Sequence, residues 1–253
     1  MVKFYVKRLI NTHELFEAMP RKSREEWKVW GNVFDNFTIR TLFELSSKGH
    51  FTNLQSPVSV GKESNVFTAK TSDGRIIIAK IYRLESCDFN RMYDYIRFDP
   101  RFMNLKRQRR KVIFSWVQRE FRNLMKAREL NVRVPMPIVF KNNVMLEEFI
   151  GDEKPAPKLK DLYPKNKKEF FEKVIKNMKA LYKGKFVHAD LSEFNILNYN
   201  DNPVFIDFST CPPLNNSMAQ EYFTRDIKNI ARFFNKIGFK TSEEEIKKKV
   251  TGK

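Results

Sequence analysis

The 253-residue chain has only two cysteines, Cys87 and Cys211, which lie far apart in the sequence. A disulfide framework or a cysteine-based zinc site needs several cysteines at short spacings, so neither is expected here. Cysteine usage of this kind favours a reducing, intracellular setting. We therefore expect the protein to be cytoplasmic.

Long hydrophobic runs are also missing. No apolar stretch approaches the roughly 20 residues that cross a bilayer. The N-terminal stretch is interrupted by Lys3, Lys7 and Arg8, so it lacks the apolar segment of a signal peptide. We expect no membrane partner, and the sequence leaves the oligomeric state open.

Positive charge, in contrast, is abundant. Lysine and arginine number 48 against 30 aspartates and glutamates, and the formal net charge is +18. Such an excess suggests a polyanionic partner such as RNA. A solvated surface with ion-pair networks explains it equally well. The hydrophobic fraction of 42% excludes a disordered chain, and the length allows one large domain or two small lobes.

Hydrophobic periodicity and turn residues predict helices and strands in a definite order. Residues 1–52 favour helix, with a cap at Asp35 or Asn36. From residue 53, short apolar runs between turn residues predict a meander of antiparallel strands. Residues 84–111 are polar, aromatic and irregular, which predicts a mobile loop.

Later segments contain more helix than strand. Helices are predicted at 112–131, 166–184 and 220–238, strands within 133–140, 143–151 and 196–208, and a linker at 152–164. Strands followed by helices predict a two-lobed α+β fold. We divide the chain into a helical extension (1–52), a first lobe (53–151) and a second lobe (152–253).

Four polar residues cluster in one short stretch: His188, Asp190, Asn195 and Asp207. Their spacing is that of kinase-like phosphotransferases, in which one aspartate accepts the substrate proton while an asparagine and a second aspartate hold magnesium. Hard oxygen ligands suit Mg²⁺, which bridges the phosphates of ATP. We expect His188 to brace the backbone. Turn or capping roles explain each residue singly, but not all four at these distances.

The upstream half provides an independent check. A kinase needs a turn over the phosphates, a lysine on the third strand and a glutamate on the next helix. Gly61 in "GKESNVF", Lys80 and Glu120 supply these in order, with a hinge-like "MLEEFIG" after them. Each alone could be a hairpin glycine, an edge lysine or a surface ion-pair partner. Together they favour a kinase.

These motifs resemble the RIO family of atypical serine/threonine protein kinases. "SVGKESNVF" is similar to its nucleotide loop, "HADLSEFNIL" to its catalytic loop, "FIDFS" to its metal-aspartate motif and "RDIKNIARFF" to its closing helix. The type-1, archaeal-like branch fits better, because the residues before the first strand leave little room for a type-2 winged helix. The resemblance implies a two-lobed protein-kinase-like fold, with an antiparallel sheet in the first lobe and a reduced, mainly helical second lobe.

The resemblance also implies a role for each matched position. ATP contacts fall on Gly61, Lys62, Ser64, Val66, Lys80, Glu120 and the backbone of Glu148 and Ile150. Asp190 is implied as the catalytic base, and Asn195 and Asp207 as ligands of Mg²⁺ or Mn²⁺. Asp207 is also a candidate phosphate acceptor, as in the family.

Four positions stand apart from common patterns. Val60 occupies a place where type-1 members usually have threonine, and Phe208 one where a smaller residue is common. Glu147 occupies the gatekeeper position, which is usually apolar, so its carboxyl group needs a partner or water. Ser192 stands where ordinary protein kinases carry lysine, which is the RIO pattern.

The stretch after Asp207 shows no activation segment or peptide-docking lobe, so we expect no conventional peptide substrate. The resemblance implies an autophosphorylating kinase, with an ATPase-like switch, that acts on the maturing small ribosomal subunit. The basic cluster "KRQRRK" at 106–111 would then meet ribosomal RNA, although a solvated helix start explains it as well.

Two alternatives stay open at the level of sequence. A small-molecule phosphotransferase of the aminoglycoside or choline kinase type shares the Asp190, Asn195 and Asp207 pattern. It usually has a larger, acidic C-terminal pocket, which the basic second lobe disfavours. The other alternative is an ATP-binding scaffold without turnover, against which the intact catalytic residues argue.

Overall fold

The structure, a computed structural model, describes residues 34–252 except 98 and 103–104. The predicted N-terminal extension is therefore tested only from residue 34 onward. Among the described residues, no helix is both long and apolar enough to cross a membrane.

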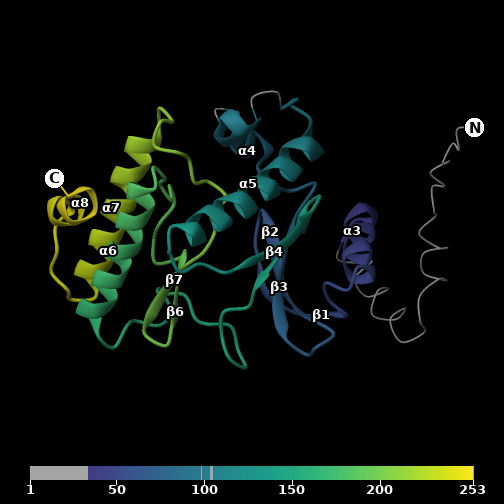
Figure 1. The fold of residues 1–253 in the computed structure, drawn as a ribbon, viewed down its shortest axis with the longest axis horizontal. Helices are drawn as coiled ribbons and strands as arrows, with labels where there is room; N and C mark the ends of the chain where they lie inside the picture. The colour runs from purple at the N-terminus through teal and green to yellow at the C-terminus, as the bar shows by residue number, and fades with distance from the viewer. Residues whose placement is uncertain (1–33, 98, 103–104, 253) are drawn as a thin grey trace, which may run out of the picture.

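A five-stranded antiparallel sheet forms the first half of the described chain (Figure 1). Its strands are β1 (Asn53–Val60), β2 (Ser64–Lys70), β3 (Ile76–Tyr82), β4 (Pro137–Lys141) and β5 (Val144–Glu148), in the order β1-β2-β3-β5-β4. Tight turns fit the sequence: Gly74 (φ 85°) and Asn142 (φ 52°) take the left-handed conformation that these residue types tolerate. The predicted meander is confirmed.

Helix α3 (Asn36–Ser47) packs on one face of this sheet. The Asp35 carboxylate caps the helix by accepting hydrogen bonds from the N–H groups of Phe37 and Thr38, both at 3.0 Å. The buried cluster between helix and sheet consists of Phe34, Ile39, Leu42, Leu45, Phe51, Leu54, Phe67, Ala69, Ile77, Ala79, Ile81, Val144 and Leu146. Asp35, one of the two predicted caps, is confirmed.

Helix α5 (Arg109–Glu129) lies on the other side of the sheet and carries Glu120 (Figure 1). The prediction of an irregular loop over 84–111 is wrong for much of its length. Helix α4 (Phe89–Ile96) and the 3₁₀ turn η1 (Pro100–Phe102) form there, and α5 begins inside the basic cluster. Tertiary burial of Met92 and Ile96 stabilises α4, which is too short to persist alone.

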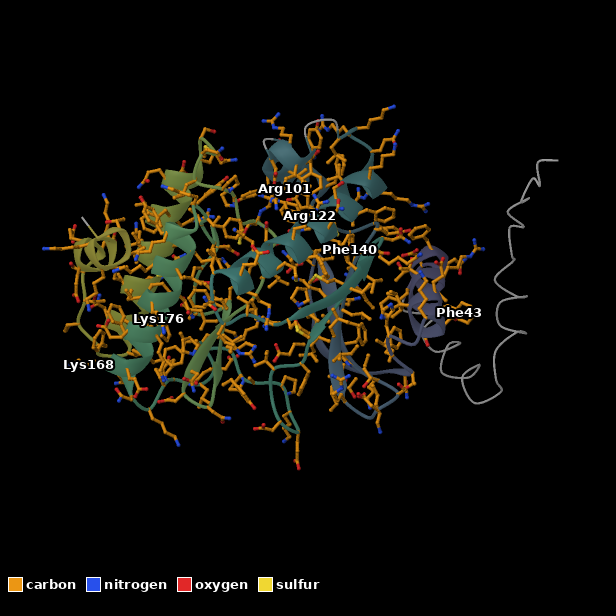
Figure 2. The ribbon with its side chains drawn as sticks, viewed as in Figure 1. Phe43, Arg101, Arg122, Phe140, Lys168 and Lys176 are labelled. Carbon is orange, nitrogen blue, oxygen red and sulfur yellow. The ribbon has the colours of Figure 1, made fainter. Side chains whose placement is uncertain are left out.

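The second half is mainly helical. It contains α6 (Lys167–Lys183), the hairpin β6 (Ile196–Tyr199) and β7 (Asn202–Phe205), α7 (Ala219–Lys236) and α8 (Glu243–Thr251). These helices lie together at the end of the molecule away from α3, and Lys168 and Lys176 project from α6 there (Figure 2). Helix α8 was not predicted, although the Ser242 cap, which accepts from the Glu245 N–H at 3.1 Å, is a recognisable start signal.

Gly151 follows β5 and connects the sheet to the helical half. Its φ is 150°, and a Cβ atom added there would lie 2.2 Å from the backbone oxygen of Lys154. We expect Gly151→Ala to destabilise the protein by clearly more than about 1 kcal/mol, because alanine is incompatible with this backbone. Urea unfolding measures the loss. Gly49→Ala is the matched control, since Gly49 has φ 79° and open space around it. An equal loss in both variants would contradict the proposed clash.

Candidate active site

Lys80 on β3 lies at the centre of the candidate site. Its Nζ donates to Glu120 Oε1 of α5 at 2.6 Å and lies 3.4 Å from Asp207 Oδ1. The Tyr82 hydroxyl donates to the other oxygen of Glu120. Burial works to lower the pKa of Lys80, but the carboxylates of Asp207 and Glu120 outweigh it and hold that pKa well above its ordinary value. Lys80 is therefore a fixed cation.

Asp207 follows β7 and brings a carboxylate to this cation. Its backbone is left-handed (φ 63°), and the Ser209 hydroxyl donates to Oδ1 at 2.8 Å. Burial raises the pKa of Asp207, but the Lys80 ammonium group and the Ser209 hydrogen bond prevail and lower it. The side chain stays 41% exposed, so an ionised oxygen remains available to a ligand.

Asp190 and Asn195 share one loop. The Asn195 side-chain amide donates to the backbone oxygen of Asp190 at 2.9 Å and to its Oδ2 at 3.1 Å. Burial and the nearby Asp207 carboxylate raise the pKa of Asp190 above its ordinary value. The Ile206 N–H donates to the Asn195 backbone oxygen at 3.0 Å, which ties this loop to the segment that carries Asp207.

Side chains of helix α7 bind the backbone of the loop that carries Asp190. The carboxylate of Asp226 accepts from the N–H of Ala189 at 2.9 Å and from the N–H of Leu191 at 2.8 Å. Burial raises the pKa of Asp226 to about 7 despite these donors. The Asn229 side chain donates to the Leu191 backbone oxygen at 3.1 Å. Hydrogen bonds from one rigid helix thus fix the position of Asp190.

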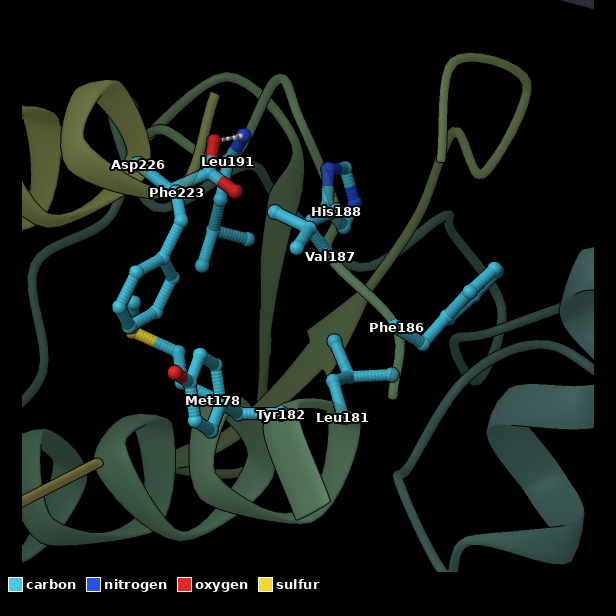
Figure 3. Close-up of a pocket in the computed structure, with 9 residues that line it drawn as sticks. All are labelled: Met178, Leu181, Tyr182, Phe186, Val187, His188, Leu191, Phe223 and Asp226. Atoms are coloured by element: carbon cyan, nitrogen blue, oxygen red, sulfur yellow. Dashed lines mark hydrogen bonds between the residues drawn. The ribbon is translucent and has the colours of Figure 1, made fainter. Parts of the chain in front are cut away.

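His188 braces the same loop, as predicted. Its Nε2 contacts the backbone oxygen of Ile206 at 3.1 Å, and its ring packs edge-on against Phe208, with centroids 4.7 Å apart. Burial lowers its pKa to about 4, so the ring is neutral near pH 7. A cavity of about 10 Å³ below the loop is lined by His188, Asp226 and apolar side chains of α6 and α7 (Figure 3). Phe208, noted as an unusual residue, therefore belongs to the packing around His188.

The nucleotide-loop residues lie on the turn between β1 and β2. The Gly61 N–H donates to the Ser64 backbone oxygen at 2.9 Å, and a Cβ atom at Gly61 would lie 3.0 Å from that oxygen. Lys62 is exposed, and Val60 is 67% exposed. Val66 pairs with Lys80 across the sheet, so both side chains lie on the same face. The turn thus leads into a strand position, Val66, on the face that carries Lys80.

The proposed hinge lies at the end of β5. The Glu148 side chain points to Arg133, with N–O distances of 2.8 and 2.9 Å. The Glu148 N–H donates to the Met136 backbone oxygen at 2.8 Å, and Ile150 is buried at 5% exposure. The side chain of Glu148 is therefore structural, and only backbone groups here could meet a base.

Residues that the sequence did not reveal connect α5 to the Asp207 segment. Arg119, beside Glu120, is fully buried; its guanidinium group contacts Asp99 at 3.1 Å and donates to the backbone oxygens of Ser209, Thr210 and Cys211 at 3.1–3.3 Å. Asn123 donates to the Phe208 backbone oxygen at 2.8 Å. The position of Arg119 directly before Glu120 was the available sequence signal. Its partners are backbone oxygens, which any residue type supplies, so no sequence pattern reveals them.

The donor set fits a magnesium ion. Asn195 Oδ1 and Asp207 Oδ2 accept no hydrogen bond from the described residues, and both are hard oxygens. No cluster of three or more metal-ligating histidine, cysteine, aspartate or glutamate residues occurs in the described part of the chain. Mg²⁺ typically takes one or two protein oxygens and completes its shell with phosphates and water. A site of this size is therefore sufficient when a nucleotide is bound.

A sheet lysine held by a helix glutamate and facing a loop aspartate is the arrangement with which protein kinases position phosphoryl groups. Fold and site together define a kinase-like phosphotransferase.

Comparison with known proteins narrows this class. The RIO domain family matches residues 65–247. RIO-type serine/threonine-protein kinase Rio1 of Methanocaldococcus jannaschii is 40% identical over 92% of this chain and 80% of its own length. Rio1 of Haloferax volcanii is 35% identical over 92% of this chain and 81% of its own length. The chain belongs to the RIO family and is an atypical serine/threonine kinase of the archaeal Rio1 type.

Solved structures agree on the fold. The crystal structure of a Rio2 kinase–ADP/Mg²⁺–phosphoaspartate complex from Chaetomium thermophilum has a TM-score of 0.66 and 20% identity to this chain. The match covers 85% of this chain and 66% of that one. The expected two-lobed α+β kinase-like fold is thereby confirmed, while the roles of the individual site residues stay predictions.

Proposed function

We propose that this kinase uses ATP with Mg²⁺ (or Mn²⁺), phosphorylates itself, and acts as an ATPase-like switch in maturation of the small ribosomal subunit in the cytoplasm. The observation that carries the proposal is the contact of Lys80 with both Glu120 and Asp207. This contact puts a fixed cation for phosphates beside a carboxylate for the metal. The ADP and Mg²⁺ named for the Chaetomium Rio2 structure support the same pair of ligands here.

Asp190 is the proposed base for transfer to a serine. Its carboxylate takes the hydroxyl proton while the serine oxygen attacks the γ-phosphorus and ADP leaves. Asn195 orients that carboxylate through the hydrogen bond at 3.1 Å. The raised pKa of Asp190 makes its carboxylate a stronger base than an exposed one. Bound Mg²⁺ would neutralise the phosphate charge.

Asp207 is the proposed phosphate acceptor for the ATPase-like cycle. Its carboxylate oxygen attacks the γ-phosphorus, the bond to ADP breaks, and an acyl phosphate forms on Asp207. Water then cleaves this acyl phosphate and returns free phosphate and the carboxylate. The lowered pKa of Asp207 keeps the attacking oxygen ionised at neutral pH. The net reaction is ATP hydrolysis.

Incubation of the whole protein with γ-labelled ATP and Mg²⁺ tests this function. We expect free phosphate to appear together with label on the protein, and hydroxylamine would release label held on aspartate but not on serine. Measurable ATP binding without turnover would instead establish a scaffold. Transfer of the label to an added aminoglycoside or choline, but not to the protein, would establish a small-molecule phosphotransferase.

The basic cluster at 106–111 is the proposed RNA contact. Arg109 is engaged, because its Nε donates to the Leu84 backbone oxygen at 2.7 Å, whereas Lys106, Arg110 and Lys111 are exposed. We expect alanine at these three positions to weaken binding of purified small-subunit ribosomal RNA. The slope of log K against log salt should fall by roughly one for each lost phosphate contact. Filter binding across a salt series measures both quantities.

A charge-matched control comes from α6. Lys168, Lys176 and Lys183 are exposed residues of α6, and Figure 2 shows Lys168 and Lys176 at the end of the molecule away from α3. Their triple alanine variant removes the same charge and should change the affinity less. Equal weakening by both triple variants would show that net charge, rather than the basic cluster, drives RNA binding.

A further inference from the structure

Glu147 on β5 is the site-facing carboxyl group to which the proposed chemistry gives no task. Strand register fixes its direction. Ile78 pairs with Glu147 and Lys80 pairs with Met145, so Glu147 and Lys80 lie on the same face of the sheet. Its neighbour Glu148 points the other way, to Arg133. Glu147 therefore faces the space between the sheet and the catalytic loop.

Glu147 has no partner there. No hydrogen bond or ion pair within 4 Å joins its side chain to another described residue, although it is only partly exposed. Among the described residues, the cation whose charge acts on Glu147 is Lys80, and Glu120 and Asp207 already hold it. A carboxyl group left unpaired at such a place is unfavourable unless a ligand satisfies it. A bound ligand with hydrogen-bonding atoms would therefore stabilise the Glu147 carboxyl group.

The electrostatic surroundings favour the neutral form of this carboxyl group. Burial is the largest cause, and the Glu120 carboxylate adds to it; the Asp207 and Glu148 carboxylates act in the same direction, while Lys80 opposes them. Together they raise the pKa of Glu147 to about 8. A neutral carboxyl group has one acceptor and one donor side by side, the same pattern as a glutamine side chain.

Position along the sheet indicates which part of a nucleotide lies here. Lys80, which pairs with Met145 of β5, marks the phosphate end. Glu147 follows Met145 by two residues and so lies nearer to Ile150 and the connection between the lobes. A nucleotide whose phosphates meet Lys80 must carry its base past Glu147 to reach the connection between the two lobes. Among purines, adenine offers an N6 donor beside an N7 acceptor, and an amide side chain binds this pair with two hydrogen bonds.

We propose that Glu147 is a specificity-determining residue that recognises adenine by accepting from its 6-amino group and donating to its N7. This inference rests on the proposed ATP-dependent function, and it adds a residue that recognises the adenine base. Guanine and hypoxanthine carry an acceptor at position 6, which would face the carbonyl oxygen of Glu147. An unpaired, desolvated acceptor pair of this kind is what makes a polar site reject the wrong ligand.

Titration calorimetry with Mg²⁺ complexes of ATP, inosine triphosphate and 7-deaza-ATP tests the proposal. Inosine triphosphate replaces the 6-amino group by oxygen, and 7-deaza-ATP lacks only the N7 acceptor. We expect the wild-type protein to prefer ATP over each analogue by roughly tenfold or more. Glu147→Leu should reduce both preferences by roughly tenfold, whereas Glu147→Gln, which keeps the donor and acceptor, should retain them.

Controls separate the possible failures. Glu129→Leu removes an exposed carboxylate at the end of α5 and should leave both preferences as in the wild type. Glu147→Leu should melt no lower than the wild type, because it replaces an unpaired carboxyl group by an apolar side chain. If either preference is the same in Glu147→Leu as in the wild type, the proposal is wrong while the kinase function stands. If the wild type binds no nucleotide at all, the proposed function itself fails.

Discussion

Asp190→Ala is expected to abolish measurable phosphate transfer to serine while ATP binding stays close to that of the wild type. Asp190 contributes proton transfer, and removal of a positioned base typically lowers a rate by roughly 10²- to 10⁴-fold. Its contacts are with Asn195 on its own loop, so the nucleotide contacts of Lys80 and Glu120 are untouched. Single-turnover transfer and calorimetry measure the two quantities separately.

Asp207→Ala should give a different pattern in the same assays. Loss of this carboxylate removes both a metal oxygen and the proposed acceptor, so binding and turnover should fall together. We expect Mg²⁺–ATP affinity to drop by at least roughly tenfold, since even the loss of an outer-shell partner of a metal ligand has that effect. Free ATP without metal should bind both proteins similarly. Label released by hydroxylamine should disappear in this variant.

Two further variants serve as controls for Asp190→Ala. Asp190→Asn keeps the shape of the side chain and removes only the base, so it should be as inactive as Asp190→Ala. Asp161→Ala removes an exposed aspartate that pairs with Lys160 away from the site, and its turnover should match the wild type. Full transfer of phosphate to serine in Asp190→Asn would show that Asp190 is not the base.

The site residues were predictable because they lie in compact local motifs. Asp190 and Asn195 are five residues apart, and this spacing together with Asp207 on the next strand predicts the chemistry. Lys80 and Glu120 required one further assumption, that the strand and the following helix pack face to face, which the 2.6 Å contact bears out. Local spacing thus carries most of the information about this site.

Elements stabilised by tertiary contacts were the ones missed. Helix α4 places Phe89, Met92, Tyr93 and Ile96 at helical spacing, but over only eight residues. It depends on the Asp88 cap, which accepts from the Arg91 N–H at 3.0 Å, and on burial of Met92 and Ile96. A polar and aromatic composition suggested a loop, but packing against α5 overrides that preference. The direction of Glu147 also needed the strand register, which the sequence does not give.

Arg119→Met is expected to be among the most destabilising substitutions in the molecule. The guanidinium group, 1% exposed as a side chain, donates to the backbone oxygens of Ser209, Thr210 and Cys211 and pairs with Asp99. Removal takes the arginine donors away from the Ser209 and Thr210 oxygens, and an unpaired buried carbonyl group costs about 1–3 kcal/mol, whereas the Cys211 oxygen keeps the Asn123 side-chain donor at 3.3 Å. We expect a loss of about 3–5 kcal/mol in the free energy of unfolding, as for other broken buried ion pairs. Urea unfolding measures it.

Arg122→Met is the matched control three residues along α5. Arg122 is exposed, and it and Arg101 are labelled near the junction of α4 and α5 (Figure 2). Its loss should change the free energy of unfolding by no more than about 0.5 kcal/mol. Arg119→Lys should recover only part of the stability, because a point ammonium group cannot reproduce the fork of donors.

The same network joins stability to catalysis. Arg119 is adjacent to Glu120 on α5, and its three carbonyl partners directly follow the segment of Asp207. At a temperature where Arg119→Met is still folded, Asp207 should therefore be less well positioned against Lys80, and turnover should fall although every catalytic residue is present. The retained Arg101–Asp99 contact at 2.6 Å keeps Asp99 paired, so this fall would report the released carbonyl groups. Wild-type turnover, or a loss of stability equal to that of Arg122→Met, would show that α5 and the Asp207 segment are held together by other contacts.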